Sequence, residues 1–136
     1  WKNDMAFEAE LDGHNFTIDA MPQAGGKDLG PRPKGLVLTA LAGCTGMDVI
    51  FMLKRKKVVV DNFEVKVRAK VAKEHPKTFT IITVSYIFDG DNLDIEKIIN
   101  AVELSDTTFC GVSAMLRNSC EVNNEIIVNG ELINRQ

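Results

Sequence analysis

Three cysteines are the residues of this 136-residue sequence best suited to chemistry, because a thiolate is at once a nucleophile, a redox centre and a metal ligand. Cys44 lies in the middle of a long apolar segment, in the run 42–46 (AGCTG), where two glycines would let a neighbouring backbone or a ligand approach closely. Cys110 begins the segment 110–116, and Cys120 precedes the last apolar stretch. Three cysteines cannot all pair within one chain, so we expect a reducing compartment, the cytoplasm.

The polar residues around these cysteines leave their roles open. Asp48 follows Cys44 by one helical turn, and a carboxylate so close would raise the pKa of a thiol unless a cation intervened. Taken alone, Cys44 also fits a small buried apolar residue, as most free cysteines are. His14 and His75 fall at the ends of predicted strands and show no metal-ligand spacing with the cysteines. We therefore predict no metal site and no bound cofactor.

The elements that must position Cys44 begin with segment 31–55 (PRPKGLVLTALAGCTGMDVIFMLKR), which is apolar nearly all the way round and predicts a buried helix. Asp48, Gly43, Thr45 and Gly46 lie inside it, so we reject a membrane span. The cluster 54–57 (KRKK) is interpreted as the solvated end of this helix. With a net charge of −3 and no long run of like charge, nucleic acid and anionic membranes are not expected partners.

The remaining segments predict an α+β protein formed by a single domain, residues 1–136. Alternation of apolar and polar residues predicts a hairpin over 5–20, joined by the proline- and glycine-rich loop 21–33 to the helix. Two further strands, 63–71 and 78–88, should pair as a hairpin, and an apolar stripe from Ile95 to Val102 predicts an amphipathic helix capped by Asp94 or Asn92. A break at 105–108, a short helix with Cys110 in its first turn and a final hairpin around 126–133 complete the antiparallel architecture.

Two segments together carry a resemblance to a known family. Segment 30–56 (GPRPKGLVLTALAGCTGMDVIFMLKRK), followed later by 107–116 (TTFCGVSAML), closely resembles the family of osmotically induced protein C and organic hydroperoxide resistance protein (OsmC/Ohr). The resemblance extends along the chain, from an N-terminal hairpin through a cysteine-bearing central helix to a second helix headed by a cysteine.

The resemblance implies an intertwined homodimer with a shared active site, in which antiparallel sheets wrap around long central helices. It also implies thiol-dependent reduction of small hydrophobic organic hydroperoxides. In that scheme Cys44 matches the peroxidatic cysteine, which becomes a sulfenic acid, and Cys110 matches the resolving cysteine, which condenses with it to a disulfide. An external dithiol, such as a lipoylated protein, would then restore the thiols. From the residues alone, Cys110 in the first turn of a helix is expected to have a lowered pKa.

The sequence departs from better-characterised relatives at the charges expected beside the peroxidatic thiolate. Their activating arginine is held by a glutamate in a Pro-Glu step, and here that step reads Pro33-Lys34, followed by Gly35. Arg32 is the nearest arginine in sequence, and without the usual anchor it or Lys34 would supply the positive charge. The pattern resembles a less studied branch of the family, and we expect a slow peroxidase.

Two classes of function therefore remain open. In the first, the protein is a peroxidase that uses Cys44, Cys110 and Arg32. In the second, it is a non-catalytic dimer that binds a small hydrophobic molecule in an apolar pocket around Cys44. Cys120 enters neither scheme and is interpreted as a structural residue at the start of a strand.

Overall fold

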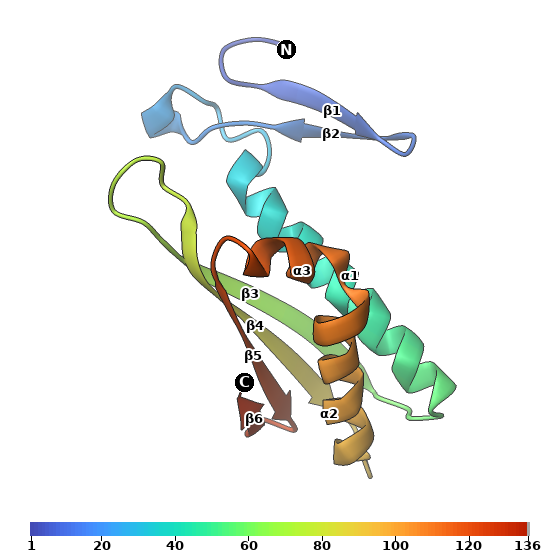
Figure 1. The fold of residues 1–136 in the computed structure, drawn as a ribbon. Coiled ribbons are helices and arrows are strands. Elements are labelled where there is room, and N and C mark those ends of the chain that lie inside the picture. Colours follow the sequence, from blue (N-terminus) through green and yellow to red (C-terminus); the bar gives the residue numbers. More distant parts are fainter. Residues whose placement is uncertain (136) are drawn as a thin grey trace. The chain divides into compact units, whose positions relative to one another are not determined.

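The computed structural model describes residues 1–135 of the chain (Figure 1). Their contacts group the chain into two units, Trp1–Thr39 and the residues from Ala40 onward. Helix α1, Pro33–Arg55, begins in the first unit and continues in the second. Pro33 occupies its first turn, where the missing N–H has no helical partner to lose.

The N-terminal unit contains the predicted hairpin. Strands β1, Phe7–Leu11, and β2, His14–Ile18, pair antiparallel, with Phe7 opposite Ile18. The turn between them is Asp12-Gly13, both with positive φ (52° and 78°), as a two-residue hairpin turn requires. A short 3₁₀ turn, η1, spans Pro22–Ala24. The hairpin prediction is thereby confirmed.

A buried carboxylate organises the loop that follows this hairpin. Asp19 is only 2% exposed and accepts hydrogen bonds from the backbone N–H groups of Ala20, Lys27 and Leu29 at 2.7, 2.9 and 3.1 Å. These bonds, that of Leu29 most strongly, lower the pKa of the Asp19 carboxyl below its ordinary value. At Gly30 a Cβ atom would lie 2.0 Å from the carbonyl oxygen of Thr17, so only glycine fits there. The loop that leads to Arg32 is thus fixed in place.

The second unit is built on a four-stranded sheet in the order β3-β4-β5-β6. Its strands are β3, Asn62–Val71; β4, Phe79–Asp89; β5, Glu121–Val128; and β6, Glu131–Arg135. The β3–β4 and β5–β6 pairs are antiparallel, as predicted, but β4 and β5 are parallel, with Tyr86 opposite Ile126. The predicted antiparallel pairing therefore holds for two of the three strand pairs, and the sheet as a whole is mixed. A parallel pair needs a long crossover connection, and the helices after β4 provide it.

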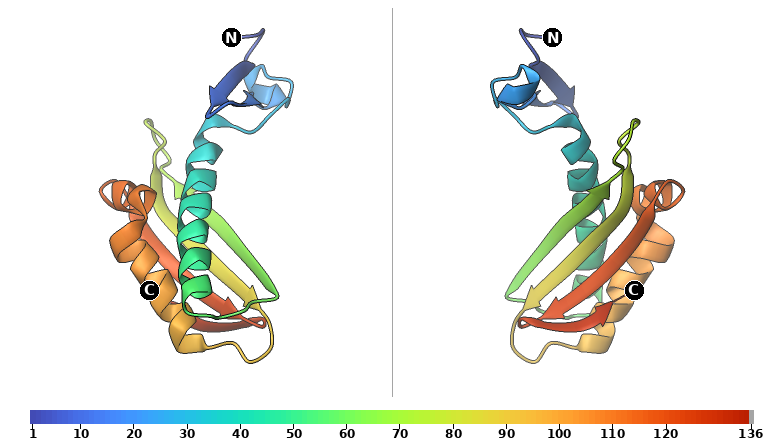
Figure 2. Two further views of the ribbon diagram at one scale, coloured as in Figure 1. Left: turned by 90° about the vertical axis from the view of Figure 1, so that its right-hand side faces the viewer. Right: turned by 90° about the vertical axis from the view of Figure 1, so that its left-hand side faces the viewer.

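That crossover consists of three consecutive helical elements. They are α2, Ile95–Leu104; the π-helical turn η2, Ser105–Phe109; and α3, Gly111–Arg117. Asp94 caps α2 by accepting a hydrogen bond from the N–H of Lys97 at 3.1 Å, which selects it over Asn92. The break predicted at 105–108 is wrong, because the chain there continues as a wider helical turn. Figure 2 shows these helices on the same face of the sheet as the part of α1 that belongs to this unit.

The core of the second unit lies between this helical layer and the sheet. Alternate residues of β4 point into it, together with one face of α2; the buried set includes Ile82, Val84, Tyr86, Phe88, Ile98, Ala101 and Val102. Helix α1 contributes Leu41, Thr45, Val49, Met52 and Leu53. At Gly46 a Cβ atom would lie 3.3 Å from the side chain of Val65, so this glycine allows the close approach of helix and sheet that the sequence suggested.

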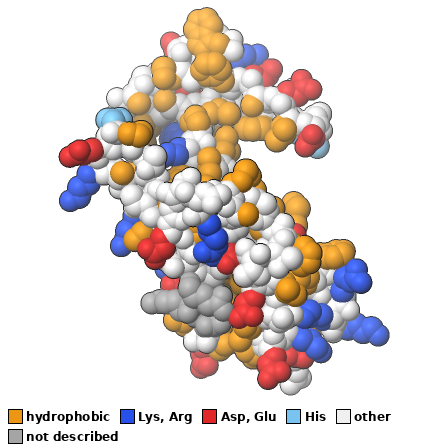
Figure 3. All heavy atoms as spheres, viewed as in Figure 1, with side chains coloured by type: hydrophobic (Ala, Val, Ile, Leu, Met, Phe, Trp, Pro, Cys, Tyr) orange, Lys and Arg blue, Asp and Glu red, His pale blue; other side chains and the backbone are white. Residues whose placement is uncertain are grey.

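Much of the apolar surface of α1 stays uncovered within one chain. Met47 is 75% exposed and Phe51 is 60% exposed, and large apolar side chains of the N-terminal hairpin are also exposed (Figure 3). By length and composition, α1 is the one helix among residues 1–135 that could cross a membrane, with a mean hydropathy of 2.0 over an 18-residue window that is 28% buried. The core helix of a soluble protein satisfies the same criteria, and Asp48 lies within the helix.

The role of Asp19 leads to a test of how the N-terminal loop is stabilised. Because its carboxyl pKa is lowered on folding, the charged form stabilises the fold above the ordinary carboxyl pKa, and this contribution is lost as the pH falls through the lowered value. We expect Asp19→Asn to lower the urea midpoint at pH 7, and the difference from the wild type to shrink at pH 3. Asp12→Asn, in an exposed turn that suits asparagine, is the matched control and should change the midpoint little. Equal midpoints for Asp19→Asn and the wild type at pH 7 would contradict this role.

Candidate functional site: a thiol pair beside a carboxylate

Cys44 and Cys110, which lie far apart in the sequence, come together in the second unit. Their sulfur atoms and a carboxylate oxygen of Asp48 all lie within 4.8 Å of one another. Cys44 and Asp48 occupy successive turns of α1, whereas Cys110 lies between η2 and α3. Cys44 is partly exposed and Cys110 is 3% exposed. A disulfide bond is about 2.05 Å long, so the two sulfurs need to approach by less than about 3 Å to form one.

The π-helical turn is what directs Cys110 inward. The backbone N–H of Cys110 donates to the carbonyl of Ser105, five residues earlier, at 2.8 Å. This extra residue in the turn leaves Phe109 59% exposed while Ser105 and Cys110 are buried. Such turns are frequent at functional sites because they change which face of a helix a side chain occupies. The polar run 105–108 is the only sequence feature that coincides with this turn.

The protonation of Cys110 differs from the sequence expectation. Its sulfur does accept a hydrogen bond from the N–H of Ser113 at 3.3 Å, in the first turn of α3. Burial has the opposite and larger effect, and it raises the pKa of the Cys110 thiol to about 11, with the nearby Cys44 adding to the rise. The predicted lowering is therefore wrong, because a helix of two turns compensates too little for the desolvation of the buried Cys110 sulfur that precedes it.

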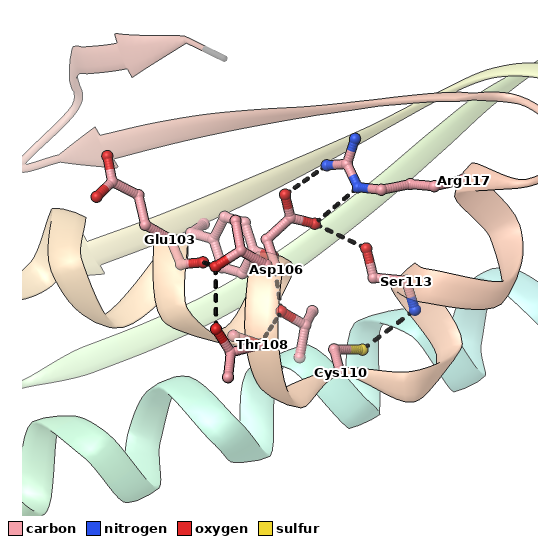
Figure 4. Close-up of polar contacts among 10 residues, drawn as sticks. Glu103, Asp106, Thr108, Cys110, Ser113 and Arg117 are labelled. Atoms are coloured by element: carbon pink, nitrogen blue, oxygen red, sulfur yellow. Dashed lines mark hydrogen bonds and ion pairs between the residues drawn. The ribbon is translucent and has the colours of Figure 1, made fainter.

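A polar cluster holds the segment that carries Cys110. Asp106 accepts hydrogen bonds from the Ser113 hydroxyl, at 2.7 Å, and from the guanidinium of Arg117, with which it also forms an ion pair. Figure 4 shows Asp106 between these two side chains, with Cys110 and its bond to Ser113 below them. The cluster links η2 to α3 on both sides of the cysteine, so the backbone that carries Cys110 is held in place.

A chain of hydroxyl groups leads from the sheet to Asp48. The hydroxyl of Thr45 lies 2.7 Å from the Tyr86 hydroxyl and 2.8 Å from the Ser105 hydroxyl, and Ser105 donates to Asp48 Oδ2 at 3.1 Å. Tyr86, Thr45 and Ser105 are each at most 1% exposed. None of these three residues was assigned to the site from the sequence. Thr45 was noted there only as a polar residue within an apolar helix.

The direction of these hydrogen bonds follows from the number of available protons. Each hydroxyl has one hydrogen to donate, and that of Ser105 goes to the Asp48 carboxylate. Thr45 must then donate to Ser105, and Tyr86 must donate to Thr45. Tyr86 remains protonated because burial raises its pKa far above neutrality. Three aligned hydroxyl dipoles therefore end on Asp48 and hold its carboxylate beside the two sulfurs.

A small apolar cavity adjoins this group. It has a volume of about 150 Å³ and is lined by Asp48, Phe51, Met52 and Phe109. Asp48 belongs both to this cavity and to the group formed with the two thiols. The cavity thus lies beside Asp48, one helical turn from Cys44, and Cys44 is not among its lining residues.

Arg32, the third predicted site residue, lies in the N-terminal unit, where it is well held. Its guanidinium forms an ion pair with Asp28 at 2.6 Å and donates to the carbonyl oxygen of Gly30 at 2.7 Å. The expectation of an arginine without an acidic anchor was therefore wrong. Asp28, in the loop organised by Asp19, provides the carboxylate that the Pro33-Lys34 step lacks.

Cys120 lies apart from the group of donors formed by Cys44, Asp48 and Cys110. It directly precedes β5, as predicted, and its sulfur donates to the carbonyl oxygen of Leu116 at 3.4 Å. This bond joins the end of α3 to the start of the strand, which agrees with a structural role.

The fold and this thiol pair define a class of protein, in which a cysteine of a long central helix meets a second cysteine at the head of a shorter one. The family model described as OsmC-like protein matches residues 25–125, and the chain therefore belongs to the OsmC family. Among curated proteins it is similar to Protein YhfA of Escherichia coli K12, at 30% identity over 123 residues, which are 90% of this chain and 89% of that protein.

Solved structures support the same fold. A hypothetical protein from Aquifex aeolicus matches with a TM-score of 0.76 and 25% identity, over 91% of this chain and 89% of that one. An organic hydroperoxide resistance protein from Elizabethkingia anophelis matches with a TM-score of 0.69 over 95% and 98% of the two chains, at 16% identity. The family model crosses the boundary between the two units of this chain.

The hydroxyl chain can be tested through stability. Thr45→Val keeps the shape of the side chain but leaves the Tyr86 hydroxyl without its acceptor and Ser105 without a donor. Because unsatisfied buried polar groups cost about 1–3 kcal/mol each, we expect a loss of about 2–4 kcal/mol in the free energy of unfolding, measured by urea denaturation at fixed protein concentration. Thr39→Val, at an exposed position of the same helix, is the control. A loss as small as that of the control would show that the hydrogen-bonded hydroxyl groups contribute nothing to the free energy of unfolding.

Proposed function

We propose that this protein is a thiol-dependent peroxidase that reduces small organic hydroperoxides. The observation that carries the proposal is the approach of the Cys44 and Cys110 sulfurs to within 4.8 Å. Membership of the OsmC family supports it, as does the similarity of fold to a protein named for organic hydroperoxide resistance. The small apolar cavity beside Asp48 favours an organic substrate over hydrogen peroxide.

The environments of the two thiols support a division of roles. Cys110 is buried and its pKa is raised to about 11, so it stays protonated at neutral pH and is poorly reached from solvent. Cys44 is the more exposed of the two and therefore acts as the nucleophile. In the first step its thiolate attacks the distal oxygen of ROOH, the O–O bond breaks, and the alkoxide leaves as ROH after taking a proton.

The second step joins the two cysteines. The product of the first step is a sulfenic acid on Cys44, and the Cys110 thiol attacks that sulfur, passing its own proton to the departing hydroxyl group. A disulfide forms and the hydroxyl group leaves as water. An external dithiol then reduces the disulfide by exchange, so the protein needs no bound cofactor. Since turnover depends on that reductant, we place the protein in a reducing compartment, the cytoplasm.

Arg32 is proposed to supply the positive charge that stabilises the Cys44 thiolate. Its pairing with Asp28 keeps the guanidinium in a defined position, as the family's glutamate does for its arginine. The carboxylate of Asp48 acts in the opposite sense, because its negative charge lies near the sulfur that attacks the peroxide. The rate should therefore depend on the arginine and remain low compared with relatives that lack such a carboxylate.

This proposal predicts distinct effects of three substitutions on the consumption of cumene hydroperoxide. With a dithiol present, Cys44→Ser should abolish turnover and Arg32→Ala should lower it about tenfold to thirtyfold, which corresponds to about 1.4–2 kcal/mol. Lys54→Ala, at an exposed position of α1, is the control for Arg32. Before reductant is added, one equivalent of hydroperoxide should consume two thiols and leave Cys120 free.

The outcome also decides between this function and the second candidate, a non-catalytic binding protein. If Cys44→Ser consumes hydroperoxide as fast as the wild type, the peroxidase proposal is wrong. The apolar cavity would then favour a non-catalytic protein that binds a small hydrophobic molecule beside Asp48. Peptide mapping that found Cys120 in the disulfide would overturn the assignment of Cys110 as the resolving cysteine.

We further propose that the functional unit is a homodimer in which a second copy covers the apolar surface of α1. Met47 and Phe51 of α1 are 75% and 60% exposed, and Met115 of α3 is 65% exposed, which is unusual for large apolar side chains in a soluble monomer. Residues of such a partner would also close the site around the thiols.

A dimer makes a prediction about assembly. At micromolar concentration the protein should sediment at about twice 15.0 kDa, and dilution should unfold it without releasing a folded monomer. Met47→Glu introduces a charge on the exposed face and should dissociate or unfold the dimer, whereas Lys54→Glu, near the exposed end of the same helix, should not. A stable monomer of the wild-type chain would contradict the proposal.

A further inference from the structure

The group formed by Cys44, Asp48 and Cys110 has a second chemical capacity besides thiol redox chemistry. Two sulfur atoms and a carboxylate oxygen lie within 4.8 Å of one another, from two different elements of the fold. In a tetrahedral zinc site, bonds of about 2.3 Å to sulfur and about 2.0–2.2 Å to oxygen separate the donors by about 3.5–3.8 Å. Since no two donors are more than 4.8 Å apart, side-chain movements of at most about 1.3 Å would bring them to these separations.

We propose that the reduced thiol pair, together with Asp48, binds a thiophilic divalent cation such as Zn²⁺. The donor set is two sulfurs and one carboxylate oxygen, and it leaves the fourth position of a tetrahedral ion to water or to a small ligand. This inference rests on the same residues as the proposed function but not on peroxidase activity. A bound cation would occupy both thiols, so it would act as a reversible inhibitor of hydroperoxide reduction.

The surroundings of the donors support a binding site rather than a chance group. Metal-binding carboxylates are themselves hydrogen-bonded in proteins, and Asp48 accepts from Ser105, the last hydroxyl of a chain of donors that starts at Tyr86. The Cys110 sulfur accepts a hydrogen bond from the N–H of Ser113. This bond uses one lone pair of the sulfur and leaves another free to bind a cation. Both orienting groups belong to buried residues, at 0% and 2% exposure.

Charge favours the same conclusion. A carboxylate beside a thiolate is a repulsive pair, and it works against the peroxidatic step proposed above. A dication placed among the three donors reverses this effect, because its attraction to each of them replaces their mutual repulsion. The side chain of Asp48, which has no helpful part in the redox cycle, thus has a defined part in binding a cation.

Binding can be measured directly with Co²⁺ as a spectroscopic probe for Zn²⁺. The reduced full-length protein should bind one Co²⁺ per chain and show a thiolate-to-cobalt charge-transfer band with the intense visible bands of tetrahedral cobalt, and equimolar Zn²⁺ should remove them. Cys44→Ser and Cys110→Ser each remove one of the two sulfur ligands. Each variant should therefore lose at least half of the intensity of the charge-transfer band. Cys120→Ser, which leaves the three donors intact, should bind as the wild type does.

The carboxylate and its positioning residue need separate variants. Asp48→Asn should weaken Zn²⁺ affinity, measured by competition with a chromophoric chelator, by at least about tenfold. Ser105→Ala leaves all three metal ligands in place but removes the hydrogen bond that orients the Asp48 carboxylate. It should weaken Zn²⁺ affinity by about tenfold. Asp91→Asn, on an exposed turn, is the control and should change nothing. Circular dichroism identifies any variant that fails to fold, and Asp48→Asn and Ser105→Ala provide independent tests of the same site.

The results separate this inference from the proposed function. Cobalt binding that survives both Cys44→Ser and Cys110→Ser unchanged, or no binding by the reduced wild type, overturns the inference. If cobalt binds as expected but hydroperoxide leaves the thiols reduced, the peroxidase proposal fails and the metal site stands. If hydroperoxide forms the disulfide but the reduced protein binds no cobalt, the reverse holds.

Discussion

The hydrogen bonds of Thr45 are the interaction on which the arrangement of the site depends. Through one hydroxyl, helix α1 is joined to Tyr86 of the sheet and to Ser105 at the end of α2. These contacts fix the rotation of α1 about its axis, because a buried hydroxyl must keep its partners. Cys44 and Asp48 flank Thr45 on that helix, so their positions relative to Cys110 follow from the same bonds.

The fold could be read from the sequence to a large extent, because its elements have clear periodicity. The hairpin around Asp12-Gly13, the strand 63–71 with its alternating exposure and the Asp94 cap all follow local rules. The parallel pairing of β4 with β5 could not be predicted in this way. Pairing between distant strands depends on how the crossover packs, and the short segment taken for one arm of a hairpin is the end of a longer strand, Glu121–Val128.

The site could be predicted in part, and chiefly through resemblance to a family. Cys44 and Cys110 were named from motifs, and the structure places their sulfurs within 4.8 Å of each other. The residues that orient them could not be found, because a tyrosine, a serine and a threonine far apart in sequence carry no shared pattern. The pKa of Cys110 was misjudged for a related reason. Its position at a helix start is local information, whereas its burial depends on the whole fold.

Because of the π-helical turn Ser105–Phe109, the position of Cys110 relative to Cys44 depends on the number of residues in that turn as well as on their identity. Each residue of an α-helix advances the direction of its side chain by about 100°. Deleting one residue from this turn would restore ordinary helical geometry and rotate Cys110 away from α1, although every cysteine and every polar partner would still be present. Gain or loss of one residue here would thus decide whether a chain that keeps both cysteines also brings their sulfurs together.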